Sequence, residues 1–256
     1  MDWVKAYYTE QSRTFASGKI TDQHRDTAAR IERWCVETGA KSLLELGAGM
    51  GGVAAVLAEQ GFEVWAVEVN PADCAHARGL ARHEVPGSFT VVEGDFYSVE
   101  LSRQFDLVFY WDGFGVGGDD DQQRLLARIA NDWLSPGGTA IIDVFSPWNW
   151  MKRSGERREY SSLDGTTWER RIEFDTDTSR FNDHWEPLPG RGEHRTQSLR
   201  CYSPADFVLL VRGTGLKVRR LLSMEGLELD FASDPTISKA LATTNGFFAE
   251  LEHDSQ

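Results

Sequence analysis

The chain has 256 residues, of which 41% are hydrophobic and 26% are charged, so we expect one globular domain, or one domain with a large insertion. A net charge of −13 disfavours nucleic acid and anionic membranes as partners. The cysteines Cys35, Cys74 and Cys201 are odd in number and far apart, which indicates neither a disulfide framework nor a zinc ribbon. We see no signal-peptide pattern and no apolar run of membrane-spanning length, so we expect a cytoplasmic protein.

Residues 1–40 are expected to form an N-terminal helical segment. Residues 1–20 carry several aromatic side chains without clean periodicity. A clearer helix begins after Thr21, which can cap it, and ends at Gly39.

Strands and helices then alternate over residues 41–146. Strands are expected at 42–46, 62–67, 89–92, 105–110 and 139–145, the last one after a turn at Pro136-Gly137-Gly138. An amphipathic helix is expected at 122–134. This alternation is typical of a doubly wound α/β fold, in which helices cover both faces of a mostly parallel sheet.

Residues 147–200 interrupt this order. Short alternating runs, such as 167–174 and 193–200, predict an antiparallel β insertion after the fifth strand. The insertion holds four of the nine tryptophans; Trp148 and Trp150 are candidates for a pocket, whereas Trp168 is expected in the insertion's own core.

The main domain resumes over residues 201–256. A capping box with proline at the first helical position starts a helix at Ser203, and two strands follow at 216–222 and 247–251. A loop with a weak helical turn is expected over 225–244.

A glycine turn, Gly47-x-Gly49-x-x-Gly52, lies between the first strand and the next helix, where a nucleotide can approach the backbone closely. Glu68 ends the second strand about 20 residues on, where a carboxylate can accept both ribose hydroxyls. A solvated strand end is the alternative reading of Glu68. These residues alone fit NAD and S-adenosylmethionine equally well.

Four further features separate the two cofactors. Glu45 precedes the first glycine by two positions, where dinucleotide folds usually have an apolar residue. Gly94-Asp95-Phe96 follows the third strand, Ser135-Pro136-Gly137-Gly138 precedes the fifth, and a strand pair ends the chain where a dehydrogenase would continue with parallel units. Together these motifs resemble the class I S-adenosylmethionine-dependent methyltransferases over residues 20–146 and 200–252.

This resemblance implies a seven-stranded sheet whose last strand is antiparallel, and it implies which residues bind the cofactor. Gly47, Ala48 and Gly49 would hold the methionine portion, Glu68 the ribose, and Asp95 with Phe96 the adenine. The remaining members of the set are Tyr8, which closes over the cofactor, Glu45, Val69, and Tyr110 with Trp111 near the sulfonium and the substrate entrance. For Tyr8, packing on the first long helix is the alternative.

The insertion resembles the substrate lids of small-molecule methyltransferases, so residues 147–200 are expected to select the acceptor. A base is needed only if the acceptor arrives protonated. The candidates are Asp112, His184 and His194, followed by Glu186 and Tyr160. Each histidine alternatively points to water as a polar lid residue, and Asp112 alternatively forms a turn before Gly113. No spacing indicates a metal site.

The sequence therefore predicts an S-adenosylmethionine-dependent methyltransferase that acts on a small molecule, with an oxygen or nitrogen acceptor favoured over carbon. The rival interpretations are an NAD-dependent oxidoreductase and a module that binds the cofactor without catalysis. We expect no nucleic-acid or membrane partner and a monomer or a homodimer.

Overall fold

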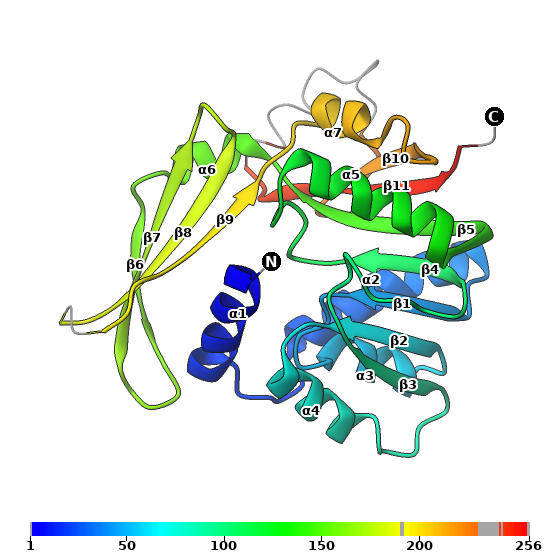
Figure 1. Cartoon of the computed structure of the whole chain (residues 1–256), viewed down its shortest axis with the longest axis horizontal. Coiled ribbons are helices and arrows are strands. Elements are labelled where there is room, and N and C mark those ends of the chain that lie inside the picture. Colours follow the sequence, from blue (N-terminus) through cyan, green and yellow to red (C-terminus); the bar gives the residue numbers. More distant parts are fainter. Residues whose placement is uncertain (1, 190–191, 230–240, 242, 255–256) are drawn as a thin grey trace.

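The structure, a computed structural model, describes residues 2–189, 192–229, 241 and 243–254. It contains a seven-stranded sheet and a separate four-stranded antiparallel sheet. Figure 1 shows the smaller sheet projecting from one side of the larger one, with helix α1 (Asp2–Phe15) lying between them. No helix in these described ranges is long and apolar enough to span a membrane.

The larger sheet and its helices follow the predicted alternation. Its elements in chain order are α2 (Asp22–Thr38), β1 (Ser42–Leu46), α3 (Gly52–Glu59), β2 (Glu63–Glu68), α4 (Pro71–Leu80), β3 (Ser88–Glu93), β4 (Phe105–Tyr110), α5 (Asp119–Arg128), η1 (Ile129–Trp133), β5 (Leu134–Phe145), α7 (Pro204–Val211), β10 (Leu216–Ser223) and β11 (Gly246–His253). Most of the loop predicted at 225–244 lies outside the described residues.

The strand order is β10-β11-β5-β4-β1-β2-β3. Strands β1 to β5 pair in parallel with one another, whereas β11 is antiparallel to both β5 and β10. This confirms the doubly wound, seven-stranded α/β fold with an antiparallel last strand. Because the carboxyl ends of β1, β2, β3 and β4 meet at one edge, the loops that follow these strands lie together there.

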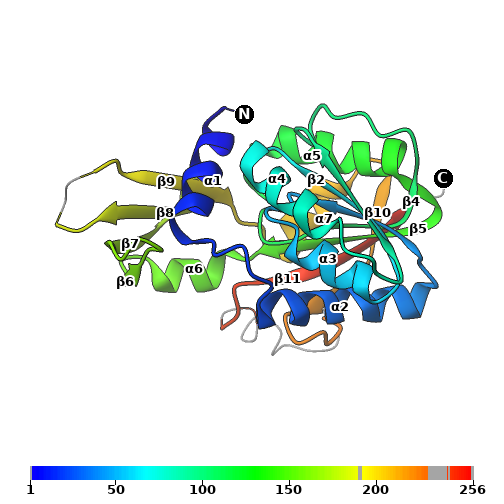
Figure 2. The ribbon, with the colours of Figure 1, turned by 90° about the horizontal axis from the view of Figure 1, so that it is seen from below.

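Helices cover both faces of this sheet because its central strands are apolar on both sides. Leu43 and Leu107 pack toward α2 and α3, while Leu44 and Val108 pack toward α5 and α7. Figure 2 shows α2 and α5 on opposite sides of the sheet. Continuous apolar strands of this kind are typical of a sheet that is buried on both faces.

The connection into β5 differs from the prediction. The pairing of β5 with β4 begins at Leu134, shifts in register, and resumes at Thr139. The predicted turn at residues 136–138 is therefore an irregularity inside a longer strand. The helix predicted at 122–134 is α5 followed by the π-helical turn η1.

The insertion consists of one helix and the smaller sheet. Its elements are α6 (Pro147–Arg153), β6 (Arg157–Ser161), β7 (Thr167–Asp175), β8 (Arg180–Pro187) and β9 (Arg195–Arg200), with the strands paired in sequence order. Burial alternates along β8: Phe181, Asp183 and Trp185 are buried, and the residues between them are half-exposed. The insertion sheet therefore has an inner face toward the rest of the molecule and an outer face toward solvent.

Helix α1 contacts both the insertion sheet and helix α4 of the main domain. Phe15 packs between Trp168 and Trp185 of the insertion, with ring centroids 6.0 and 4.8 Å away. On the other side, the Ser12 hydroxyl donates to Asp73 of α4 at 2.8 Å. The two sides of α1 thus contact different partners, which explains why its sequence lacks a single apolar stripe.

Candidate active site

The turn after β1 brings backbone amides to the carboxyl edge of the sheet. The N–H groups of Gly47 and Ala48 both donate to the carbonyl of Val67 on β2, at 2.9 and 3.2 Å. Gly47 has φ = 69° and lies so close to Tyr110 that a Cβ on it would be 3.3 Å from the ring. Glycine therefore permits both the left-handed turn and the close approach of β4.

Glu68, at the end of β2, is held by this turn. Its Oε2 accepts the N–H of Gly49 at 2.7 Å, and its Oε1 accepts the N–H of Asn70 at 2.8 Å. Burial raises the pKa of Glu68, and the two backbone donors act in the opposite direction. Since the side chain is 7% exposed and fixed at both oxygens, Glu68 is not the solvated strand end that the sequence left open.

A cavity of about 480 Å³ opens at this edge of the sheet. Of the residues that the sequence indicates for the cofactor, those that line it are Tyr8, Glu45, Gly47, Ala48, Gly49, Glu68, Val69, Phe96, Tyr110 and Trp111. Asp95 follows β3 at the same edge but does not line the cavity, and its Oδ1 accepts the N–H of Tyr97 at 2.8 Å. The structure thus brings this set together, with Asp95 just outside it.

A second buried glutamate, Glu45, belongs to this cavity. Glu45 lines it and is 4% exposed, and its Oε2 has no hydrogen-bond partner among the described residues. Burial raises the pKa of Glu45 to about 8, an effect that Glu68 adds to and the N–H of Ala54 opposes. An unpartnered carboxylate oxygen of this kind favours a cationic ligand, because burying it alone is costly.

Asp112 is the candidate base that lies at the cavity. It follows β4 in a left-handed conformation with φ = 54°, which aspartate tolerates better than most residues. Its side chain lines the cavity. Desolvation by the surrounding protein is the main cause that raises its pKa to about 6, an effect that Arg170 opposes and Asp183 adds to. A carboxyl group with such a pKa is ionised at neutral pH and can still accept a proton.

A second carboxyl group, that of Asp143, accepts a hydrogen bond from the backbone of Asp112. The N–H of Asp112 donates to Oδ2 of Asp143 on β5 at 3.3 Å. Burial and, to a smaller extent, the charge of Asp112 raise the pKa of Asp143 to about 7. Asp143 was not anticipated from the sequence, because it lies inside an apolar strand with no motif around it.

The structure does not bring His184 or His194 to the cavity. His184 lies on the outer face of the insertion sheet, where its ring nitrogens contact Glu173 and Thr196, each at 2.9 Å. His194 is exposed and lies 3.5 Å from Glu186. Within the described ranges, no three potential metal-ligating side chains gather.

Trp150, Trp168 and Trp185 belong to the core of the insertion, whereas Trp148 is half-buried against the core of the larger sheet. Trp150 stacks on Phe181 with ring centroids 3.9 Å apart, and Trp168 and Trp185 pack around Phe15. Trp148 and Trp150 do not line the cavity, contrary to the expectation from their position after β5. Aromatic residues are as suited to a core as to a pocket, so composition alone did not separate the two uses.

Helix α1 and the start of α2 supply cavity residues that the sequence did not indicate. Members of this group are Val4, Ser12, Phe15, His24 and Thr27. His24 takes part in the capping box with Thr21, which explains its place at the first turn of α2. A capping box predicts where a helix begins, but it does not predict that this helix end lines a cavity.

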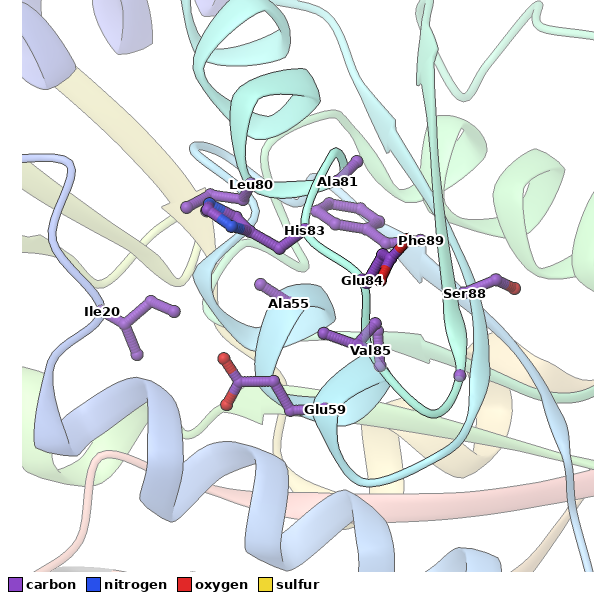
Figure 3. Close-up of a pocket in the computed structure, with 12 residues that line it drawn as sticks. Ile20, Ala55, Glu59, Leu80, Ala81, His83, Glu84, Val85, Ser88 and Phe89 are labelled. Atoms are coloured by element: carbon purple, nitrogen blue, oxygen red, sulfur yellow. The ribbon is translucent and has the colours of Figure 1, made fainter.

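A second pocket, of about 260 Å³, lies on the outer side of α3 and the end of α4 (Figure 3). It is lined mainly by small apolar side chains, with His83, Glu84 and Glu59 among them, and it shares Leu80 with the larger cavity. The glycine turn, Glu68 and Asp112 all belong to the larger cavity, so we take that cavity as the candidate active site.

Comparison with known proteins agrees with this geometry. The family model described as a methyltransferase domain matches residues 43–138. Cypemycin N-terminal methyltransferase of a Streptomyces species is 28% identical over 119 residues, which are 46% of this chain and 47% of that protein. The chain thus matches about half the length of its curated relatives.

Solved structures cover nearly the whole chain. The CcbJ methyltransferase of Streptomyces caelestis has a TM-score of 0.72 at 22% identity, over 91% of this chain and 90% of that one. The sugar N-methyltransferase KedS8 of a Streptoalloteichus species has a TM-score of 0.65 at 23% identity, over 89% and 87%. The chain thus has the fold of the class I S-adenosylmethionine-dependent methyltransferases, with an antiparallel insertion after β5, and its residues 43–138 match a methyltransferase domain.

Proposed function

We propose that the chain transfers a methyl group from S-adenosylmethionine to a nitrogen or oxygen atom of a small molecule. The single observation that carries this proposal is the joint position of Glu68, the glycine turn and Asp112 on one cavity in a class I methyltransferase fold. The sugar enzyme is named as an N-methyltransferase and the cypemycin enzyme as an N-terminal methyltransferase, which favours nitrogen.

The residues of this cavity fit S-adenosylmethionine. The cofactor carries a positive sulfonium and an ammonium group, and the cavity offers Glu45 with an unpartnered buried oxygen beside the glycine turn. Glu68 already accepts the N–H of Gly49, and we infer that it accepts ribose hydroxyls as well, since each carboxylate oxygen has two lone pairs. Phe96 and Tyr110, with ring centroids 5.2 Å apart, offer apolar surface for the adenine side.

When bound, the cofactor supplies a methyl group on a positively charged sulfur: the acceptor's lone pair forms the new bond to carbon as the carbon–sulfur bond breaks and its electron pair stays on sulfur. The protein's own part is to align the two reactants and keep water out, which can supply roughly 7–11 kcal/mol of the barrier. We assign Asp112 as the group that takes a proton from the acceptor, because it lines the cavity and its pKa is raised to about 6.

Thermal unfolding with S-adenosylhomocysteine, NADH and NADPH in separate samples tests the cofactor. A ligand at a hundredfold excess over its dissociation constant adds about 2.7 kcal/mol. For a chain of this size, that should raise the midpoint by about 5–11 °C. A rise with S-adenosylhomocysteine alone supports the proposal, and a rise with a nicotinamide alone contradicts it. Turnover of S-adenosylmethionine with an acceptor then separates an enzyme from a module that only binds.

A further inference from the structure

Tyr8 of α1 joins the cavity to a polar network inside the insertion. Its hydroxyl donates to Oε1 of Gln197 on β9 at 3.0 Å. The amide nitrogen of Gln197 donates in turn to Oδ2 of Asp183 on β8 at 3.2 Å. Arg170 on β7 completes the network with two hydrogen bonds to Asp183, at 2.7 and 3.0 Å.

The direction of every hydrogen bond in this network is fixed. Asp183 is 2% exposed and salt-bridged to Arg170, so its carboxylate only accepts hydrogen bonds. The nitrogen of the Gln197 amide must therefore face Asp183, which turns its carbonyl oxygen toward Tyr8. Since that carbonyl can only accept, Tyr8 has to give its single proton to Gln197.

This leaves Tyr8 as a hydrogen-bond acceptor on its cavity side. Tyr8 lines the same cavity as Asp112, and the charges of Asp112 and Asp183 both act on its phenol. Burial, the largest effect, and these charges raise the pKa of Tyr8, so the phenol stays protonated and its proton stays with Gln197. Tyr8 and ionised Asp112, which both line the cavity, thus both act as hydrogen-bond acceptors toward an incoming group.

We propose that Gln197, Asp183 and Arg170 are positioning residues that hold Tyr8 as an acceptor, and that the site thereby selects an amine over an alcohol. A neutral primary amine has two N–H donors for Tyr8 and Asp112 and keeps a lone pair for the methyl carbon. A hydroxyl has one donor and satisfies only one of the two groups. An ammonium ion first gives one proton to the Asp112 carboxylate. Its nitrogen lone pair then forms the bond to the methyl carbon as the carbon–sulfur bond breaks with its electron pair on sulfur, so the products are an N-methylammonium ion and S-adenosylhomocysteine.

This inference rests on the proposed methyl transfer, so its test separates the two. Three matched pairs of probes serve: benzylamine with benzyl alcohol, cyclohexylamine with cyclohexanol, and glucosamine with glucose. For each probe, thermal unfolding of the S-adenosylhomocysteine complex gives binding, and release of S-adenosylhomocysteine from S-adenosylmethionine gives turnover. We expect the amine of at least one pair to exceed its alcohol by about 10- to 100-fold, the equivalent of one charge-assisted hydrogen bond.

Two variants then reverse the hydrogen-bond direction at Tyr8 by substituting residues that do not line the cavity. In Asp183→Asn, the new amide nitrogen can donate to the carbonyl oxygen of Gln197. The Gln197 amide then rotates and donates from its nitrogen to the Tyr8 oxygen. The Tyr8 hydroxyl therefore points its proton toward the cavity. Gln197→Leu releases the same proton and leaves the Asp183–Arg170 pair intact. Both should lower the amine-to-alcohol ratio about 10-fold or more, with S-adenosylhomocysteine affinity within about twofold of wild type.

Glu169→Gln is the matched control, because Glu169 is an ion-paired carboxylate on the outer face of the same sheet, bound to Arg157. It should leave the ratio unchanged. Equal binding of amines and alcohols, including no measurable binding of either, overturns the inference, as does a ratio that neither variant moves. Failure of the wild type to bind S-adenosylhomocysteine would instead contradict the proposed function itself.

Discussion

The carboxylate of Glu68 lies 2.7 Å from the backbone nitrogen of Gly49, so the end of β2 and the turn after β1 form one unit. Two segments that the sequence indicated separately therefore hold each other in place before any ligand binds. A site with this degree of preorganisation loses little ordering entropy when its ligand enters.

Glu68→Gln should weaken S-adenosylhomocysteine binding by about 1.5–3 kcal/mol, the contribution of a hydrogen bond to a charged group. Isothermal titration calorimetry measures this loss directly. Glu63→Gln is a suitable control, because Glu63 begins the same strand at the opposite edge of the sheet and pairs with Arg103. An unchanged affinity in Glu68→Gln would remove Glu68 from ribose binding.

Asp112→Asn should lower turnover by about 10²–10⁴-fold if Asp112 accepts the proton of the acceptor. The pKa of Asp112 is raised to about 6, so the wild-type rate should fall as the pH drops through that value and the carboxylate takes up a proton. The asparagine variant should lack this limb of the pH–rate profile and should keep its S-adenosylhomocysteine affinity. A variant within threefold of the wild-type rate would exclude Asp112 as the base.

Glu45→Gln should stabilise the ligand-free protein in mildly alkaline solution. The folded-state pKa of Glu45 is about 8, above its unfolded value, so the folded form holds the proton more tightly and Glu45 costs stability as the pH rises toward 8. Replacing a buried, unpartnered carboxylate should recover about 1–3 kcal/mol at pH 8 and almost nothing near pH 4.5. Urea unfolding at the two pH values measures the difference, with Glu59→Gln on exposed α3 surface as the control. An equal effect at both pH values would contradict the assignment of burial as the cause.

Arg195→Ala should loosen α1. The guanidinium of Arg195 donates to the carbonyl of Glu10 at 2.9 Å and to the hydroxyl of Thr14 at 2.7 Å, and it lies over the ring of Trp168. Losing these bonds, each about 1.5–3 kcal/mol, should speed amide exchange in α1 by about tenfold or more. Hydrogen-exchange mass spectrometry of the first fifteen residues gives the answer. Arg157→Ala, on the outer face, should leave exchange in α1 unchanged.

The sequence predicted the parallel part of the fold well because its signals are local. Each strand end there carries its own marker, such as the glycines after β1 or Glu68 after β2, and parallel pairing brings these markers to one edge. The family resemblance supplied the antiparallel last strand, which no local pattern specifies.

The catalytic side of the site was harder to predict, because it depends on which face of a strand points inward. His184 and Asp183 are neighbours in sequence, yet only Asp183 faces the core. The regular alternation of Phe181, Asp183 and Trp185 carried this information, since residues two apart share a face. His184 was chosen as a candidate base for its acid–base chemistry, although the alternation places it on the outer face. The role of Tyr8 depends on Gln197, far away in sequence, so no local pattern could reveal it.

The docking of α1 also has a consequence for synthesis. Its anchoring partners, Trp168, Trp185 and Arg195, are translated only after the whole parallel portion of the large sheet. Because domains generally acquire structure as they emerge from the ribosome, α1 emerges well before these partners and reaches its final position only after they are made. Until then, the aromatic side chains of Tyr7 and Phe15 remain accessible to chaperones. A ribosome that stalls before the insertion would release a chain in which α1, which lines the cavity, is not held in place.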